Sequence, residues 1–379
     1  MRDLIVTTHT PVLRSGQMIR TYGIVRAISA HRGVDVLYVR FDAPEPSAEF
    51  TSIPGIALHA VEPSRGLGRA IAYARTRAAG VPRGFARGVS RELELRAQAL
   101  AQSPERGRVI ADGPTVAAAL ARLADRRAVI YNAHNLESEL RPQLTDFGPA
   151  KLRRLRAFER GLLARASESW MVSDSDIASA RELCPDARLR YVPNVLDVDA
   201  IAPVHAPAGT RSALFIGSFA YTPNRTALSF LVDEVFPRVW ATLPDAKLIV
   251  VGRGLEQTSF EDPRVQALGF VDDLGAVYQR SSCALVPLLQ GGGSPLKFIE
   301  ALAHGLPVIA TPRATAGLSV SDGENCIVAD GAPAFAAALS GVLESGAAEI
   351  GRRGRELAES SYSIQTLSEL LAPEHDLSA

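Results

Sequence analysis

Short apolar runs that alternate with helical patterns along the whole chain constrain the fold more than any other feature of the sequence. The runs that we predict to be strands lie at residues 4–7, 35–39, 109–111, 128–132, 169–172, 212–216, 246–251, 265–268, 283–287, 308–310 and 326–328. Strands that are separated by helices pair in parallel, because each helix carries the chain back to the same end of the sheet. The sequence therefore predicts an α/β protein with parallel sheets wound with helices.

The length of the chain indicates two domains. A chain of 379 residues exceeds a single hydrophobic core. A stretch without periodicity, rich in proline and alanine, runs from about residue 192 to residue 209. We predict that it links a first domain, residues 1–195, to a second domain, residues 196–362.

The most informative local pattern is a glycine-rich turn that leads into a helix. The glycines at 291–293 follow a strand-like run, and Ser294 and Pro295 suit the N-cap and the first helical position. The first N–H groups of the helix then favour an anion. Glu300 lies six residues beyond the cap, within reach of a sugar hydroxyl beside that anion. The pattern predicts a site for a diphosphate and a ribose, although a strand–turn–helix unit with nothing bound gives the same pattern.

Lysine usage favours the ligand site. Lys151, Lys247 and Lys297 are the three lysines among the chain's 41 basic residues. Lys297 lies in the first turn of the helix that follows the glycines. A lysine presents phosphate with a compact point charge, which suits a crowded diphosphate pocket.

The net charge of zero conceals a division between the two halves. Residues 1–195 contain 29 Lys and Arg and 20 Asp and Glu, so their charge is 29 − 20 = +9. The remaining residues contain 41 − 29 = 12 basic and 41 − 20 = 21 acidic side chains, which gives −9. Seven arginines and no acid lie between Arg65 and Arg91, and a second basic cluster lies at 151–156. Such stretches suit an anionic membrane surface or an anionic acceptor, and a solvated helical face accounts for them equally well.

Several classes of site and location are not indicated by the sequence. No apolar run approaches the roughly 20 residues that span a bilayer, and the N-terminus enters a strand without a signal-peptide core. Cys184, Cys283 and Cys326 are too scattered for a disulfide framework or a zinc site. We therefore expect a cytoplasmic protein, with peripheral association at the inner face of the membrane as a further expectation.

Two Asp-x-Asp pairs have the spacing of metal-binding motifs. We interpret Asp174 and Asp176 as the cap of a helix that follows the run 169–172, and Asp197 and Asp199 as part of the linker. No metal site is therefore expected.

Four segments form an ordered series in the second half, at residues 214–224, 248–254, 268–274 and 291–311, and supporting pieces lie at 131–138, 171–174 and 192–197. The series resembles the retaining glycosyltransferases of family 4. That family has the GT-B fold, in which two Rossmann-like, doubly wound parallel-sheet domains face a central cleft. The resemblance implies an acceptor-binding N-terminal domain and a donor-binding C-terminal domain. We also expect a helix at about 363–379 that packs back on the first domain.

The resemblance implies roles for individual residues. Glu300 matches a glutamate that binds the nucleotide ribose, and His134 matches a histidine beside the transferring sugar. Residues implied in catalysis are His134, Lys297 and Glu300, and those implied in donor binding are Gly16, Gly217, Ser218, Asn224, Gly252, Arg253, Phe270, Val271, Gly292, Gly293, Ser294, Pro295 and Leu296. For His134 a hydrogen-bonded loop histidine is the plain alternative, and Glu137 nearby fits the cap of a short helix.

The sequence departs from the family pattern at two places. The first glutamate of the family's E-x7-E motif falls at Gly292, and the usual arginine and lysine clamp is replaced near Ser218 and Asn224. A subgroup with Gly-Gly-Gly-Thr/Ser-x-Leu-Lys in place of that glutamate is most similar to this chain. In that subgroup the lysine, here Lys297, would supply the missing phosphate charge.

The expected function is transfer of a sugar, with retention, from a UDP- or GDP-sugar to a glycan, lipid-linked or small-molecule acceptor. Polysaccharide or glycolipid biosynthesis is the expected setting, with no cofactor, no metal and no nucleic-acid partner. Two alternatives stay open. One is an isomerase of the UDP-sugar 2-epimerase kind, and the other is a non-catalytic GT-B protein that binds a nucleotide.

Overall fold

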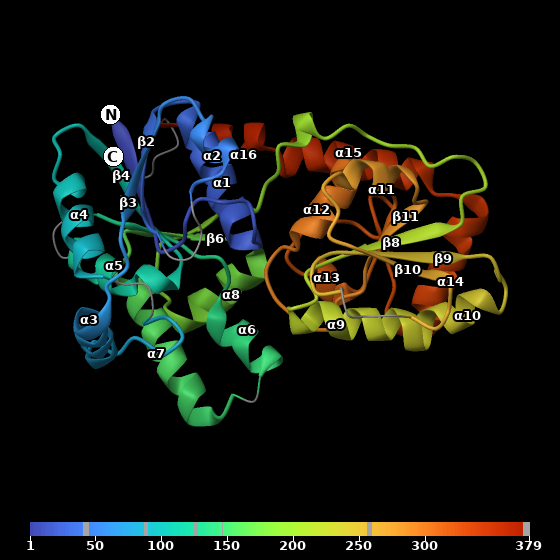
Figure 1. Cartoon of the computed structure of the whole chain (residues 1–379), viewed down its shortest axis with the longest axis horizontal. Helices are drawn as coiled ribbons and strands as arrows, with labels where there is room; N and C mark the ends of the chain where they lie inside the picture. The colour runs from blue at the N-terminus through green and yellow to red at the C-terminus, as the bar shows by residue number, and fades with distance from the viewer. Residues whose placement is uncertain (41–44, 87–89, 125–127, 146, 256–259, 374–379) are drawn as a thin grey trace. The chain divides into compact units, whose positions relative to one another are not determined.

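Parallel strands form two sheets in the computed structural model, which describes residues 1–40, 45–86, 90–124, 128–145, 147–255 and 260–373. Among these residues the first sheet has the order β3-β2-β1-β4-β5-β6-β7, and the second has the order β10-β9-β8-β11-β12-β13. The named strands pair in parallel in both sheets. Figure 1 shows helices on both faces of each sheet, which is the predicted α/β winding.

Every predicted apolar run forms a strand, with ends that shift by up to three residues. The strands of the first sheet are β1 (Arg2–Thr7), β2 (Gly33–Val39), β3 (Ile56–Val61), β4 (Arg106–Asp112), β5 (Ile130–Asn132), β6 (Glu168–Met171) and β7 (Leu189–Tyr191). Those of the second are β8 (Ser212–Ile216), β9 (Lys247–Val251), β10 (Val265–Gly269), β11 (Cys283–Val286), β12 (Val308–Ala310) and β13 (Ile327–Val328). β3 and β7 were not predicted from the sequence. Both are edge strands of the first sheet and are largely half-exposed; β7 lacks an apolar run because Arg190 interrupts it, whereas β3 is apolar apart from His59.

Helices separate the strands throughout the described chain. Those before β8 are α1 (Gly16–Ser29), α2 (Ala48–Thr51), α3 (Gly66–Ala78), α4 (Arg91–Ala101), α5 (Ala117–Ala124), α6 (Glu137–Leu144), α7 (Pro149–Arg165) and α8 (Asp174–Leu183). Those after it are α9 (Thr222–Ser229), α10 (Phe236–Trp240), α11 (Leu274–Gln279), α12 (Leu296–Ala303), α13 (Pro312–Thr315), α14 (Gly331–Ser345), α15 (Ala348–Ser361) and α16 (Ile364–Leu370). Single turns form η1 (Pro114–Val116), η2 (Val198–Ala200) and η3 (Phe230–Val235), the last a π-turn that joins α9 to α10.

The chain divides into two units, each built around one sheet. The first unit comprises Met1–Asn194 and Leu367–Ala379, and the second comprises Val195–Thr366. The boundary falls inside the predicted linker. The C-terminal residues return to the first unit, where the carbonyl of Ser368 lies 3.0 Å from His31 Nε2 and the carbonyl of Leu371 accepts a hydrogen bond from Arg108. The helix there is shorter than the predicted 363–379, and residues 374–379 lie outside the described chain.

The strand order indicates where each unit would bind a ligand. Successive strands are added toward one edge of the sheet up to a point and toward the other edge after it. This reversal of strand order falls between β1 and β4 in the first unit and between β8 and β11 in the second. Ligands of doubly wound sheets bind outside the carboxyl ends of the strands at such a reversal. A ligand site is therefore expected at the segments that follow these four strands.

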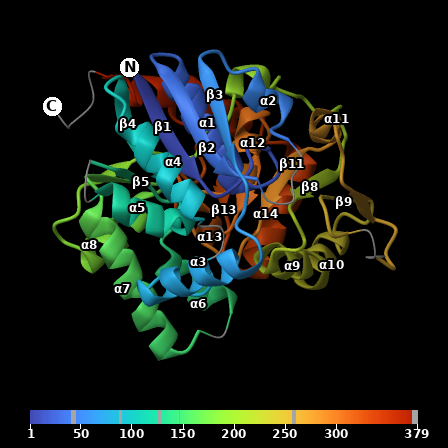
Figure 2. The same cartoon turned by 60° about the vertical axis from the view of Figure 1, so that its left-hand side comes forward.

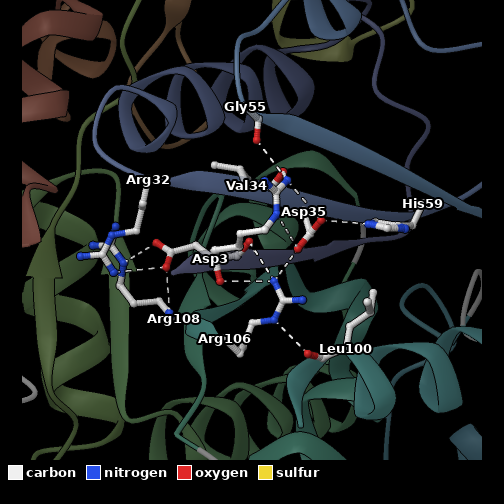
Figure 3. Close-up of polar contacts among 10 residues, drawn as sticks. Asp3, Arg32, Val34, Asp35, Gly55, His59, Leu100, Arg106 and Arg108 are labelled. Carbon is white, nitrogen blue, oxygen red and sulfur yellow. Dashed lines mark hydrogen bonds and ion pairs between the residues drawn. The ribbon is translucent and has the colours of Figure 1, made fainter. Parts of the chain in front are cut away.

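The opposite, amino edge of the first sheet contains a buried ionic network, drawn in Figure 3. Asp35 on β2 lies 2.6 Å from Arg106 Nη1, 3.0 Å from His59 Nε2 and 3.2 Å from Arg2 Nε. Burial alone would raise the pKa of Asp35, but the hydrogen bonds from His59, Arg106 and Arg2 outweigh it and hold the pKa at about 2. This carboxylate is fully used within the fold.

Asp3 on β1 belongs to the same edge of the sheet. Its side chain is fully buried and accepts hydrogen bonds from Arg108 Nε at 2.7 Å and from Arg32 Nη1 at 3.3 Å (Figure 3). The network ties β1, β2 and β4 to one another at their first residues. We assign it to stability, because it lies at the end of the strands away from the expected ligand site.

Candidate functional site

The glycine turn of the second unit follows β11 and leads into α12, as the sequence indicates. The helix begins at Leu296 and Pro295 is its N-cap residue, so the prediction that Ser294 is the N-cap was wrong. A Cβ on Gly317 would lie 2.3 Å from the carbonyl oxygen of Gly293, so these two backbone segments pack tightly. The amides of Leu296 and Lys297 have no helical acceptor and can meet an anion, whereas the Phe298 amide donates to the carbonyl of Pro295 at 2.9 Å.

Residues distant in sequence hold the turn in place. Arg313 donates a hydrogen bond to the carbonyl of Gly291, and Thr311 Oγ1 donates one to the carbonyl of Leu288 at 2.5 Å. Gly291 and Gly293 have positive φ values of 121° and 71°, which other residues rarely adopt. Sequence reasoning missed Arg313, Thr311 and Gly317, because nothing in their local pattern indicates a contact with the turn.

Lys297 reaches from α12 to the first turn of α9, the helix that follows β8. Its ammonium lies 2.5 Å from Asn224 Oδ1 and 4.8 Å from the centre of the Phe215 ring. Asn224 in turn donates to the carbonyl of Ser218 at 2.8 Å, and a Cβ on Gly217 would come within 2.8 Å of the Asn224 amide. Burial lowers the pKa of Lys297 to about 7, since no charged partner compensates for lost hydration. The structure thus brings Lys297, Gly217, Ser218 and Asn224 together.

Glu300 lies on the same face of α12 as Lys297, three residues further on. It is half-buried, and its Oε2 accepts a hydrogen bond from the Tyr278 hydroxyl at 3.4 Å. Burial raises the pKa of Glu300 to about 7, against a smaller lowering by that hydrogen bond. Tyr278 is buried and stacks on His304 at 4.0 Å between ring centres, which fixes its position. Neither Tyr278 nor His304 was predicted from the sequence.

An aromatic surface lies beyond the carboxyl ends of β9 and β10. The Arg253 guanidinium stacks 4.6 Å from the centre of the Phe270 ring, and Phe270 is 56% exposed. Val271 beside it is half-buried. Gly252 has a φ of 141°, and a Cβ there would lie 1.7 Å from the carbonyl oxygen of Gly217. A planar base could stack on such a surface.

A second polar cluster lies in the first unit, at the carboxyl ends of β4 and β5. Asp112 is fully buried and accepts hydrogen bonds from Thr21 Oγ1 at 2.9 Å and Asn132 Nδ2 at 2.7 Å, and His134 Nε2 lies 2.8 Å from its Oδ1. Burial alone would raise the pKa of Asp112, but the interactions with His134, Thr21 and Asn132 bring it to about 2. An ionised carboxylate only accepts, so His134 donates through Nε2–H. Its Nδ1 then presents a lone pair when the ring is neutral.

Open nitrogens distinguish this cluster from the network at the other edge. Among the described residues, His134 Nδ1, His9 Nδ1 and Arg20 Nη2 are buried without a hydrogen-bond partner. His9 follows β1, and its pKa is lowered by burial despite the Asp112 charge. Arg20 is otherwise well bonded, for example to the carbonyl of Val192 at 2.8 Å. Three unsatisfied nitrogens at a strand reversal are what a missing polar ligand would leave. His9 and Arg20 were not predicted.

The remaining predicted positions have simpler surroundings. Gly16 is the first residue of α1, after the N-cap Ser15. Glu137 opens α6 and accepts a hydrogen bond from Arg141 Nε at 2.8 Å. Asp174 and Asp176 lie in the first turn of α8, whose N-cap is Ser173; the interpretation of the two aspartates as the cap was therefore wrong.

In the described ranges no three His, Cys, Asp or Glu side chains are grouped as metal ligands. No helix of the described chain combines the length and apolarity needed to cross a bilayer.

The part of the chain that matches a family of known sequences includes the glycine turn and α12. Residues 210–345 match the family model for glycosyl transferases group 1. Over 166 residues the chain is 29% identical to a phosphatidyl-myo-inositol mannosyltransferase of Mycolicibacterium smegmatis, covering 40% of this chain and 42% of that protein. It is 25% identical over 136 residues to an uncharacterised 44.6 kDa protein from the cps region of Klebsiella pneumoniae, covering 33% and 35%. The matched region thus spans less than half of either relative.

Structural comparisons cover nearly the whole chain. The sucrose-phosphate synthase of Thermosynechococcus elongatus aligns with a TM-score of 0.72 at 18% identity, covering 97% of this chain and 96% of that one. The HepE protein of Anabaena in complex with UDP aligns with a TM-score of 0.67 at 14% identity, covering 97% and 98%. With the two parallel sheets, these likenesses confirm the predicted fold class. The chain has the GT-B fold, and its second unit carries the sequence pattern of the glycosyl transferases group 1.

Proposed function

We propose that the protein is a glycosyltransferase that uses a nucleotide-diphosphate sugar as donor. The observation that carries the proposal is the arrangement on α12, where Lys297 and Glu300 share a face behind the glycine turn and neither has a counter-charge among the residues that the structure describes. A diphosphate would supply the anion that Lys297 lacks, and a ribose hydroxyl would donate to Glu300. The family match over residues 210–345 includes all of these groups.

The chemistry asks mainly for charge stabilisation. Negative charge gathers on the leaving diphosphate as its bond to the sugar stretches. The amides at the start of α12 and the Lys297 ammonium are preorganised to meet that charge where it develops. Arg253 and Phe270 would hold the base. We further propose that transfer proceeds with retention and without a metal ion, in line with the resemblance to family 4.

His134 would act in the first unit. With its Nε2–H bonded to Asp112, the neutral ring offers Nδ1 as an acceptor for a sugar hydroxyl. Asp112 fixes the orientation of the ring in the same way that carboxylates orient catalytic histidines elsewhere. A bound hydroxyl would satisfy the open nitrogen, which is the functional alternative to a purely structural loop histidine.

For the acceptor we propose a lipid-linked molecule at an anionic membrane surface. Helix α3 lies at the lower left of Figure 1 and comes to the front in Figure 2, so it is on the outside of the first unit. It exposes Leu67 by 78% and Ile71 by 52%, one turn apart, and carries exposed arginines. Each arginine near an anionic surface contributes about 1 kcal/mol, and the attraction fades within a Debye length.

Vesicle sedimentation tests the membrane proposal. Pelleting with anionic vesicles should fall steeply with salt and with charge reversal at Arg69, Arg75 and Arg83. Equal pelleting with neutral and anionic vesicles, or none with either, would refute it and leave the transferase proposal standing.

One assay separates transfer from the two alternatives. The protein is incubated with a panel of UDP- and GDP-sugars, and released nucleoside diphosphate and sugar epimers are measured. Release of diphosphate supports transfer or hydrolysis, and epimer formation without release would indicate an isomerase. Binding without turnover would indicate a nucleotide-binding protein, for which the replaced acid at Gly292 is the favouring observation.

A further inference from the structure

A cavity of about 550 Å³ lies within the first unit and shares no lining residue with the two polar clusters described above. Helix α7, the start of α5 and the turn that follows α3 form its walls. Its volume is within the range of small-molecule sites. Ala117, Leu120, Leu162 and Val81 provide a buried apolar lining.

One face of α7 supplies half of the lining. The contributing positions are Arg154, Ala157, Phe158, Gly161, Leu162 and Arg165. Their spacing of three and four residues places them on a single helical face, with an arginine at each end and small or apolar groups between. Phe158 is held by stacking on Phe85 at 5.6 Å between ring centres. The wall is therefore apolar along its length and cationic at its ends.

Gly161 is the most telling residue of this face. Glycine is unfavourable inside a helix, so its presence in the middle of α7 needs a reason. Close packing is not that reason, because no atom outside the local helix backbone lies within 4 Å of the position of an added Cβ. The missing side chain leaves the cavity open at its wall.

The turn after α3 completes the cavity. Gly80 has a φ of 85°, and this conformation ends the helix and lets the Val81 amide bond back to the carbonyl of Thr76 at 3.3 Å. Val81 thereby joins the lining. Arg77 bends over the same turn and donates to the carbonyl of Val81 at 2.5 Å.

The charges of the lining select an anion. Arg77, Arg154 and Arg165 border the cavity, and none of the described residues that line it is acidic. Within the described chain, Arg154 and Arg165 make no ion pair with a carboxylate. Guanidinium groups bind phosphate in a bidentate manner. We infer that the cavity binds one acyl chain of an anionic phospholipid along α7, with the lipid phosphate on Arg154 or Arg165.

This inference rests on the proposal that the first unit meets anionic lipid, but it concerns a single lipid in one half-open cavity of that unit. Dodecyl phosphate below its micelle concentration serves as the probe, with dodecyl maltoside and inorganic phosphate as the chain alone and the headgroup alone. Calorimetry on the full chain should show binding of dodecyl phosphate and at least about tenfold weaker binding of either part.

Two variants and matched controls locate the probe. Gly161→Leu fills the opening and should weaken binding of dodecyl phosphate about tenfold or more. Gly341→Leu is the control, because Gly341 also lies inside a helix, α14 of the second unit, with nothing within 4 Å of an added Cβ. Arg154→Gln or Arg165→Gln should weaken binding, whereas Arg181→Gln, exposed on α8 and outside the lining, should not.

The outcomes separate this inference from the proposals on which it rests. Unchanged binding by Gly161→Leu, or by both Arg154→Gln and Arg165→Gln, would overturn the lipid cavity. So would absence of dodecyl phosphate binding in a protein that still pelleted with anionic vesicles, and that result would leave the membrane proposal intact. Nucleoside diphosphate release is measured in parallel and reports on the transferase proposal alone.

Discussion

Buried charges occur both at the amino edge of the first sheet and beyond the carboxyl edge of the second sheet, and the two regions treat them in opposite ways. At the amino edge, Asp35 is surrounded by cationic donors and its pKa falls to about 2. On α12, the described neighbours of Lys297 and Glu300 are neutral, and burial moves the pKa of each to about 7. The charges of the first region are compensated within the fold, whereas those of Lys297 and Glu300 have no charged partner among the described residues.

The difference indicates how to tell a structural charge from a functional one. Burial of a charge costs free energy unless a partner compensates. A chain that leaves this cost uncompensated on two residues of one helical face has them poised for an anion and a hydroxyl. Asp112 and His134 are intermediate, because the carboxylate is satisfied while the ring retains an open nitrogen.

Loss of Asp35, whose charge is compensated within the ionic network of the first sheet, should have the largest effect, a loss of folding stability. Asp35→Asn leaves Arg106 buried beside a neutral amide and should lower the free energy of unfolding by about 3–5 kcal/mol in a denaturant titration. Asp245→Asn is the control, since its pair with Arg211 is exposed and should matter little. If both variants unfold at the same midpoint, the network of Figure 3 does not stabilise the fold.

Loss of Lys297, whose ammonium has no charged partner among the described residues, should lower turnover and not stability. Lys297→Ala should lower kcat/KM for the donor by about 10²–10³, the usual loss for one preorganised group that meets developing charge. Lys297→Arg should lose less, because it keeps the charge, and exposed Lys247→Ala should match the wild type. Initial rates of nucleoside diphosphate release measure all three. Equal rates would remove Lys297 from the site.

Loss of the Glu300 carboxylate should weaken donor binding without loss of stability. Glu300→Gln replaces a charge-assisted hydrogen bond to ribose by a neutral one and should reduce nucleotide affinity by about 1–3 kcal/mol in calorimetry. Its midpoint of unfolding at pH 8 should stay the same or rise, because the variant no longer buries an ionised carboxylate. Glu344→Gln, an exposed position on α14, is the matched control. A lower midpoint for Glu300→Gln would mean that the Glu300 charge stabilises the fold, as that of Asp35 does.

The pH dependence should separate the two regions most finely. Donor capture requires ionised Glu300 and protonated Lys297, so kcat/KM should rise with pH as Glu300 loses its proton and fall as Lys297 does, with a maximum near 7. Asp35 has a lowered pKa, so its stabilisation is present above about pH 3.9 and is lost as the pH falls toward 2. Activity should therefore decline between pH 6.5 and 5 in a folded protein. A profile that stays flat from pH 6 to 8 would contradict the assignment.

The fold was largely predictable from sequence because a parallel strand is buried on both faces. Each buried strand therefore appears as an apolar run, and each helix between strands has its own period. Of the two edge strands that were missed, β7 lacks that signal. In β7, Arg190 alternates with Leu189 and Tyr191, and all three are half-exposed.

The candidate site was predictable only in part, because local pattern does not report contacts between distant segments. Glu300, Lys297 and the glycine turn are contiguous and could be found together. Arg313 and Gly317 contact the turn from beyond β12, and the partners of Asp112 come from α1, β5 and the loop after β5. The start of α12 was misplaced by one residue, because Pro295 and not Ser294 is its N-cap.

The backbone contact between Gly252 and Gly217 limits how this site can be altered. With 1.7 Å between a would-be Cβ and a carbonyl oxygen, position 252 admits glycine alone, and Gly317 is similarly fixed by Gly293. Directed evolution of donor preference would waste every codon randomised at these two positions. Libraries should instead vary Ser218, Phe270 and Val271, whose side chains border the site without supporting its backbone.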